Sequence, residues 1–410
     1  MTTQHGLPEG DGPLAGVRVL DLSWIVAGPT VGRALADYGA TVIRVESPIR
    51  VDTARVVGPF HGDLPGVENS GLYGNVNAGK WGLTLSLNVP EAQDIFKRLV
   101  QWADIVSESF TAGILARWDL HYPRLRELKP DLIMLSSTLL GQTGPYNQVS
   151  GFGSQGAGMS GVQYLTGWPD RAPAGPFGPY TDYPAPRFAL TALLAALDHR
   201  NRTGEGVFID QAQAEGTLQL LAPAVMDYLN GGPALVARGN DDPQMCPHGV
   251  YPCSPTDGRA ESWIAIAVAS DEQWRSLAGL IDMEASLSFD ERRQQQAEIE
   301  DALIAWTAQR SADEVETMLQ SKGISAHRLA TTEDAANDPQ LAHRNHFQRL
   351  PHSLHGETVL EGPRYLHSET PGAPARPAPQ YGEHNEQILK DVLGLSDTEI
   401  EDLAASGALS

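Results

Sequence analysis

The chain has 410 residues, enough for two domains, and hydrophobic residues make up 41% of it, so it can bury a sizeable core. Its 29 basic and 51 acidic residues give a formal net charge of -22, which disfavours sequence-independent binding to the phosphates of nucleic acids. Two cysteines, Cys246 and Cys253, are too few for a disulfide framework or a zinc ribbon.

We expect neither a signal peptide at the N-terminus nor a membrane-spanning segment in the apolar runs. Residues 1–12 are polar and lack the basic start and apolar run of a signal peptide. The longest largely apolar stretch, residues 188–197, is too short to cross a bilayer. We therefore expect a soluble cytoplasmic protein with no nucleic-acid or membrane partner.

The first half of the chain alternates strand-like and helix-like segments. Residues 17–22 and 41–46 are apolar runs rich in branched side chains, and a helical segment between them ends near Tyr38. Further helices are predicted at 90–103, 187–199 and 212–229, and further strands at 104–107, 132–136 and 206–210. This alternation predicts a doubly wound parallel α/β sheet.

From residue 230 the composition changes. A Gly-, Pro- and Asp-rich stretch leads to a strand at 262–268 and to charged helical segments at 271–280, 294–308 and 312–322. Residues 351–379 are rich in proline and are expected to form an extended connection. Amphipathic helices at 383–393 and 397–405 should return to the first domain. The predicted organisation is a large α/β domain at 1–229, a small α+β domain at 230–340, and a linker with returning helices at 341–410.

Three motifs suggest ligand sites, but each lacks either a residue or the structural position that the ligand requires. Residues 74–80 have P-loop spacing, yet Trp81 stands where a Ser or Thr hydroxyl must reach magnesium, which leaves Lys80 as a lone cation for a phosphate. Residues 151–156 fit G-x-G-x-x-G but do not follow a strand directly. Histidines at 343, 346, 352 and 355 have no suitably spaced carboxylate or thiol, so we expect no metal site.

Asp182 lies in a Gly- and Pro-rich loop that ends where an apolar helix begins. Its carboxylate is either a capping or turn group, or a nucleophile at a loop–helix junction; pattern and spacing leave both open. His248 lies between two cysteines that we expect to be buried and structural, and with Tyr251 it is a candidate for a ligand pocket on the small domain.

The order of several motifs resembles that of the family III CoA-transferases, the CaiB/BaiF family. The matching segments cover nearly the whole chain and are PLAGVRVLDLS at 13–23, AGP at 27–29, GATVIRVE at 39–46, NAGK at 77–80, ESFTAG at 108–113, GQTGPY at 141–146, RTGEG at 202–206 and GEHNEQIL at 382–389. The resemblance implies a Rossmann-like large domain built from both chain ends, a smaller domain between them, and two subunits interlocked like chain links.

The resemblance also implies the chemistry. Asp182 matches the family's aspartate, which attacks an acyl-CoA to give a mixed anhydride and then an aspartyl-CoA thioester. Coenzyme A is a substrate, and neither a metal nor a permanently bound cofactor is expected. The form of residues 181–186 is similar to subunits that act on aromatic or branched dicarboxylic acids, such as benzylsuccinate CoA-transferase, so we expect such an acceptor and favour succinyl-CoA as donor.

Positions matching the family's CoA contacts follow from the same resemblance. Arg117 is expected to pair with a phosphate and Phe110 to offer a packing surface. The sequence departs from the family at Ser47, where many members have a basic residue that Arg50 could replace from nearby. The full set of matching positions is Val26, Ala27, Leu85, Ser86, Leu87, Asn88, Ser109, Phe110, Thr111, Arg117, Ser150, Gly151, Phe152 and Gly153.

Two alternatives remain beside the transferase. An α-methylacyl-CoA racemase of this fold pairs a histidine with an aspartate, and residues 150–154 contain neither. A non-catalytic subunit of a heteromeric transferase would not need Asp182. The sequence leaves open whether the chain forms a homodimer or pairs with a homologous subunit.

Overall fold

The computed structural model describes residues 6–256 and 258–409, which form two compact units. The first unit comprises Met1–Tyr164, Gly175–Leu235 and Ala342–Ser410, and the second comprises Leu165–Ala174 and Val236–Leu341. Segments before and after the second unit therefore fold together. The first five residues of the stretch expected to lack a signal peptide lie outside the described residues.

A six-stranded parallel sheet forms the centre of the first unit and confirms the predicted α/β fold. The strands lie in the order β3-β2-β1-β4-β5-β6, which is the order of a Rossmann sheet. Their bounds are β1 Arg18–Asp21, β2 Thr41–Glu46, β3 Trp81–Thr84, β4 Ile105–Glu108, β5 Ile133–Thr138 and β6 Phe208–Ala212. The order reverses between β1 and β4, and in such sheets ligands bind beyond the carboxyl ends of the strands at that point.

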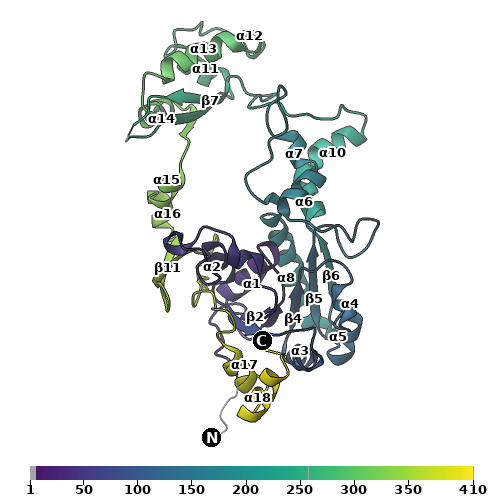
Figure 1. The fold of residues 1–410 in the computed structure, drawn as a ribbon. Helices are drawn as coiled ribbons and strands as arrows, with labels where there is room; N and C mark the ends of the chain where they lie inside the picture. Colours follow the sequence, from purple (N-terminus) through teal and green to yellow (C-terminus); the bar gives the residue numbers. More distant parts are fainter. Residues whose placement is uncertain (1–5, 257, 410) are drawn as a thin grey trace. The chain divides into compact units, whose positions relative to one another are not determined.

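Helices cover both faces of this sheet (Figure 1). Val19 of β1 packs in one cluster with α1 (Ala27–Asp37) and α8 (Ala185–Thr203), while its neighbour Leu20 packs in the other with α3 (Pro90–Trp102) and α17 (Asn385–Asp391). Successive residues of a strand point to opposite faces, so one short strand anchors both layers. Further helices of the first unit are α2 Gly71–Asn77, α4 Ile114–Arg117, α5 Tyr122–Leu128, α6 Gly153–Met159 and α18 Asp397–Ala405. The helices α7 Val162–Leu165 and α16 Pro339–His343 each contain a boundary between the two units.

Two predicted segments differ from the structure. The single helix expected at 212–229 is divided into α9 (Gln213–Leu218), a short 3-10 turn and α10 (Ala222–Leu229), with Pro223 in the first turn of α10 because proline cannot donate inside a helix. The extended connection expected from 351 begins instead with a hairpin of β10 (Phe347–His352) and β11 (Gly356–Glu361). A two-stranded ribbon tolerates Pro351 because both strands are edges.

The second unit has its own antiparallel sheet, β7 (His248–Cys253), β8 (Ser262–Ala267) and β9 (Ser325–Arg328). Its core gathers around the fully buried Trp274. The helices of this unit are α11 Asp271–Ala278, α12 Phe289–Gln294, α13 Gln296–Thr307, α14 Ala312–Ser321 and α15 Thr332–Ala336. Within the described residues, no helix is both long and apolar enough to cross a membrane.

Candidate active site

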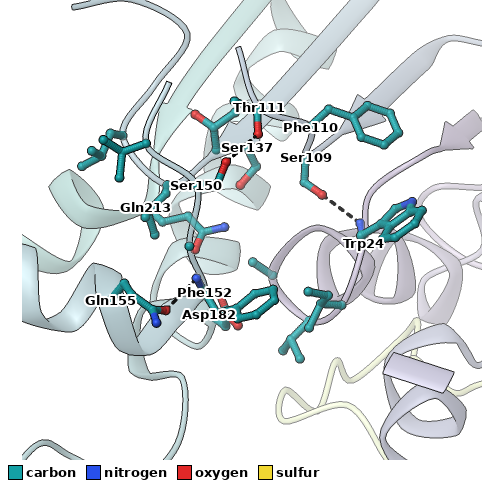
Figure 2. Close-up of a pocket in the computed structure, with 18 of the residues that line it drawn as sticks. Trp24, Ser109, Phe110, Thr111, Ser137, Ser150, Phe152, Gln155, Asp182 and Gln213 are labelled. Atoms are coloured by element: carbon teal, nitrogen blue, oxygen red, sulfur yellow. Dashed lines mark hydrogen bonds between the residues drawn. The ribbon is translucent and has the colours of Figure 1, made fainter. Parts of the chain in front are cut away.

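A cavity of about 550 Å³ lies at the carboxyl ends of the central strands of the first unit (Figure 2). Loops that follow β1, β4 and β5 form its walls, as expected for the reversal point of a Rossmann sheet. Figure 2 shows Asp182 beside Phe152 at one end and Thr111 and Phe110 at the other. Its lining residues include Trp24, Ile25, Val26, Ala27, Arg50, Ser109, Phe110, Thr111, Ser137, Thr138, Ser150, Gly151, Phe152, Gln155, Asp182 and Gln213.

The loop after β1 is held in an unusual conformation. Ile25 has a φ of 67°, a left-handed value that is rare for a β-branched residue. Its N–H donates to the Asp52 carboxylate over 3.1 Å, and the Trp24 N–H donates to Ser109 Oγ over 2.8 Å (Figure 2). These bonds offset the local strain and fix the wall of the cavity next to Val26.

Lys80 is not available to a ligand, so its predicted role as a lone cation for a phosphate is wrong. The side chain is fully buried, and its Nζ donates to Asp21 Oδ2 over 2.7 Å and to Asn77 Oδ1 and Pro29 O over 2.8 Å each. Three donors are all that an ammonium group has. Burial lowers the pKa of Lys80 to about 8, against the pull of Asp21. Lys80 therefore belongs to the ionic core beneath the first loop.

Asp182 ends a short 3-10 turn, Tyr180–Asp182, just before α8. Pro184 occupies the N-cap of α8, and no side chain caps that helix, so Asp182 is not a capping residue. Its side chain is buried, and among the described residues no hydrogen bond or ion pair reaches its carboxylate. Burial raises the pKa of Asp182 to about 7. A desolvated carboxylate without partners is a stronger nucleophile than one in water.

The raised pKa of Asp182 predicts a pH dependence. If the ionised carboxylate reacts, kcat/KM should be nearly constant above about pH 8, half of that value near pH 7, and fall about tenfold per pH unit below about pH 6. Rates of CoA transfer measured from pH 5 to 8.5 test this. Glu108, whose pKa burial also raises to about 7, provides the control, because Glu108→Gln should keep the same midpoint. A rate that is independent of pH between 5 and 7 would contradict the assignment.

The structure brings together most of the predicted CoA contacts. Val26, Ala27, Ser109, Phe110 and Thr111 line the cavity with Asp182, and so do Ser150, Gly151 and Phe152. Thr111 Oγ1 and Ser150 Oγ lie 3.1 Å apart and link the two walls.

Other predicted residues lie elsewhere. Leu85, Ser86 and Leu87 are buried after β3, where the Ser86 N–H donates to Ala408 O over 2.8 Å. Asn88 and Arg117 are exposed, and neither lines this cavity. Their roles as CoA contacts remain predictions.

The two small-domain candidates lie on β7 of the second unit. His248 Nδ1 lies 2.6 Å from Asn240 O, and Tyr251 is buried with a hydroxyl that has no hydrogen-bond partner among the described residues. Both stay predictions as substrate contacts. Cys246 and Cys253 are free and buried, as expected.

Sequence reasoning missed several polar residues of the cavity. Ser137 and Thr138 end β5, and Gln213 follows β6 directly. The sequence could have indicated these residues, because they lie at the carboxyl ends of predicted strands, where ligands bind in such sheets. Arg50, named only as a substitute for the absent basic residue, does line the cavity, with its guanidinium 5.1 Å from the centre of the Trp24 ring.

Gly153 supports the turn that carries Asp182. A Cβ at this position would lie 2.4 Å from Pro179 O, the same oxygen that accepts the Asp182 N–H over 3.0 Å. Gly153→Ala should therefore displace the turn and lower kcat/KM about 100-fold, because displacements near 1 Å have that effect. Steady-state kinetics of Gly153→Ala and Gly158→Ala test this. The second variant should stay near wild type, since its Cβ meets only the flexible end of Gln163 at 3.2 Å. Equal activity of the two variants would exclude this role.

The comparisons with known proteins agree with this fold. Residues 14–385 match CoA-transferase family III, and the chain belongs to that family. It is 35% identical to succinyl-CoA–D-citramalate CoA-transferase of Chloroflexus aurantiacus, over 96% of this chain and 97% of the relative, and 33% identical to succinate–glutarate CoA-transferase of Agrobacterium fabrum, over 94% and 97%. A solved CaiB/BaiF family protein from Brucella suis superposes with a TM-score of 0.83 at 30% identity, covering 93% of this chain and all of that one. The chain is thus a CoA-transferase that uses CoA thioesters as substrates.

Proposed function

We propose that the protein moves CoA from succinyl-CoA to a carboxylic acid through covalent intermediates on Asp182. The observation that carries this proposal is the buried carboxylate of Asp182, unpartnered among the described residues, at the end of a cavity formed by the family's matching positions. Relatives named for succinyl-CoA or succinate support the donor.

Each half of the reaction balances without a cofactor. An Asp182 oxygen bonds to the thioester carbonyl carbon, the carbon–sulfur bond breaks, and CoA leaves as thiolate. The thiolate then attacks the Asp182 carbonyl carbon, which forms an aspartyl-CoA thioester and releases succinate. The acceptor carboxylate attacks the aspartyl-CoA carbonyl carbon, the carbon–sulfur bond breaks, and CoA leaves as thiolate. The thiolate then attacks the acceptor carbonyl carbon of the resulting anhydride, which forms the acceptor-CoA thioester and releases the Asp182 carboxylate. The backbone N–H of Gly151, in the wall of the cavity, is a candidate to stabilise the oxyanions, whereas the Phe152 N–H already donates to Gln155 Oε1 over 2.9 Å.

The acidic protein needs local cations to hold CoA. Arg50 is the best placed in the cavity, because it borders the loop after β1 and forms no ion pair among the described residues. Arg117 is the second candidate, outside the cavity. Phe110, edge-on to both Trp24 and Trp118, offers the packing surface.

The acceptor is a small acid. Relatives are named for citramalate, which is branched, and for glutarate, and these names favour a dicarboxylic acid. The aromatic or branched acceptor expected from residues 181–186 stays a prediction. We propose that the acceptor is a branched or linear dicarboxylate. An aromatic dicarboxylic acid is included among the acceptors tested below.

We also propose that the chain works as the interlocked dimer expected from the resemblance, with itself or with a homologous subunit. Large apolar side chains around α10 support a partner, since they are exposed in the single chain; they are Leu218, Leu220, Met226, Tyr228 and Leu229. Light scattering of the purified chain should give twice its mass of 44.1 kDa. A monomer without activity would indicate a missing homologous subunit.

Succinyl-CoA incubated with citramalate, glutarate, malate and benzylsuccinate tests the proposed function. Chromatography should show one new acyl-CoA and an equal amount of succinate. Hydrolysis alone, with every acid, would contradict transfer. Exchange of an α-proton with deuterated water would favour the racemase.

A further inference from the structure

A second cavity of about 320 Å³ within the first unit also reaches Asp182. Among the described residues, only Val26 and Asp182 line both cavities. Its walls come from α1, α2, the first turn of α8 and the residues that follow β11. At about 30 Å³ per water molecule, it has room for a small acyl chain.

Because Asp182 lines both cavities, one cavity is available to each half of a thioester that reacts there. The carbonyl carbon that Asp182 attacks carries the CoA sulfur on one side and the acyl chain on the other. If the CoA arm fills the first cavity, as proposed above, the acyl chain has to leave the reacting carbon in a different direction. The second cavity offers such a space, because it also reaches Asp182 but has almost entirely different walls.

The second cavity contains three arginines in different electrostatic states. Arg33 contacts Asp37, with 3.4 Å between Nε and Oδ2, and Arg364 pairs with Glu361 over 2.5 Å. Arg187 has no carboxylate partner among the described residues, and its guanidinium donates only to Tyr183 O. Asp37 and Glu361 are thus each paired with an arginine, whereas the positive charge of Arg187 is not balanced by a paired carboxylate among the described residues.

We propose that the second cavity binds the acyl chain and that Arg187 binds the distal carboxylate of dicarboxylic substrates, both succinyl-CoA and the acceptor. This inference rests on the proposed function of Asp182. A guanidinium pairs bidentately with a carboxylate, and a monocarboxylic substrate leaves that pair unmade. Arg187 is exposed and lies on the first turn of α8, the helix that follows Asp182. It is therefore a specificity-determining residue for dicarboxylates over monocarboxylates.

Single-turnover labelling of Asp182 by two donors tests this inference. Succinyl-CoA carries a distal carboxylate, and butyryl-CoA has the same chain length without one. Arg187→Ala should slow labelling by succinyl-CoA about 100-fold and change labelling by butyryl-CoA less than threefold. Arg187→Lys should recover part of the loss. Arg202→Ala, in the same helix but outside the second cavity and paired with Asp198, should behave as wild type with both donors.

The outcomes separate the two levels of the proposal. Equal slowing with both donors would make Arg187 a structural residue and overturn the subsite, and no slowing with either donor would overturn it as well. Failure of every donor to label the wild-type protein would refute the covalent function itself, and the subsite with it.

Discussion

Replacing Asp182 by asparagine is expected to lower kcat/KM for CoA transfer by about 10⁴-fold or more. The amide keeps the size of the side chain but has no nucleophilic oxygen, and loss of a covalent nucleophile has effects of this order or larger. This loss is measured by steady-state kinetics with succinyl-CoA as donor and an acceptor acid that the wild-type protein converts to its CoA thioester. Asp198→Asn is the matched control, since this exposed aspartate of α8 pairs only with Arg202.

The same variant should be folded and, at neutral pH, more stable than the wild type. Burial raises the pKa of Asp182 from 3.8 to about 7, so its protonated form favours the folded state fully below about pH 4. That contribution is lost as the pH rises to about 7. Asp182→Asn should therefore gain up to about 4 kcal/mol of stability over the wild type at pH 8 and almost none at pH 4. An inactive variant that is also destabilised at pH 8 would mean that the lost activity reflects lost structure.

Replacing Lys80 by methionine is expected to destabilise the protein by about 3–5 kcal/mol, because it leaves the carboxylate of Asp21 buried without its main partner. Arg44, 3.9 Å from Asp21, cannot replace it, because it already pairs with Asp52. Urea denaturation measures the change. Lys97→Met, which removes only an exposed contact to Asp94, should cost less than about 1 kcal/mol.

A double variant separates charge from packing in this ionic core. Asp21→Asn combined with Lys80→Met removes both charges and should recover part of the lost stability. The KM for CoA should stay near the wild-type value in the folded fraction of Lys80→Met. A stable Lys80→Met protein with a greatly raised KM for CoA would contradict this assignment and indicate that Lys80 binds a phosphate of CoA.

The alternation of segments predicts most of the fold. β2 is found at the predicted bounds, and the ends of α3 and β5 lie within two residues of the predicted ones. These elements are predictable because each buries apolar residues that are continuous or periodic in the local sequence. The β10–β11 hairpin was missed because proline-rich segments usually do not pair, and nothing local shows that both strands are edges. Residues 165–174 join the second unit without any change of composition that could mark them.

The candidate site was only partly predictable. Motif order located Asp182 and the loops after β1 and β4, but the burial and missing partners that decide between a cap and a nucleophile depend on the folded chain. The role of Lys80 depends on Asp21, 59 residues away in the sequence. The second cavity joins α1, α8 and the residues after β11, and no local pattern relates these segments.

Covalent trapping on Asp182 tests the central claim most directly. The protein would be mixed briefly with succinyl-CoA, treated with hydroxylamine or borohydride, digested, and analysed by mass spectrometry beside Asp182→Asn. The account predicts a modified peptide that contains Asp182 in the wild type and its absence in the variant. Transfer of CoA with full turnover but no modification of Asp182, or modification of a different residue, would contradict it.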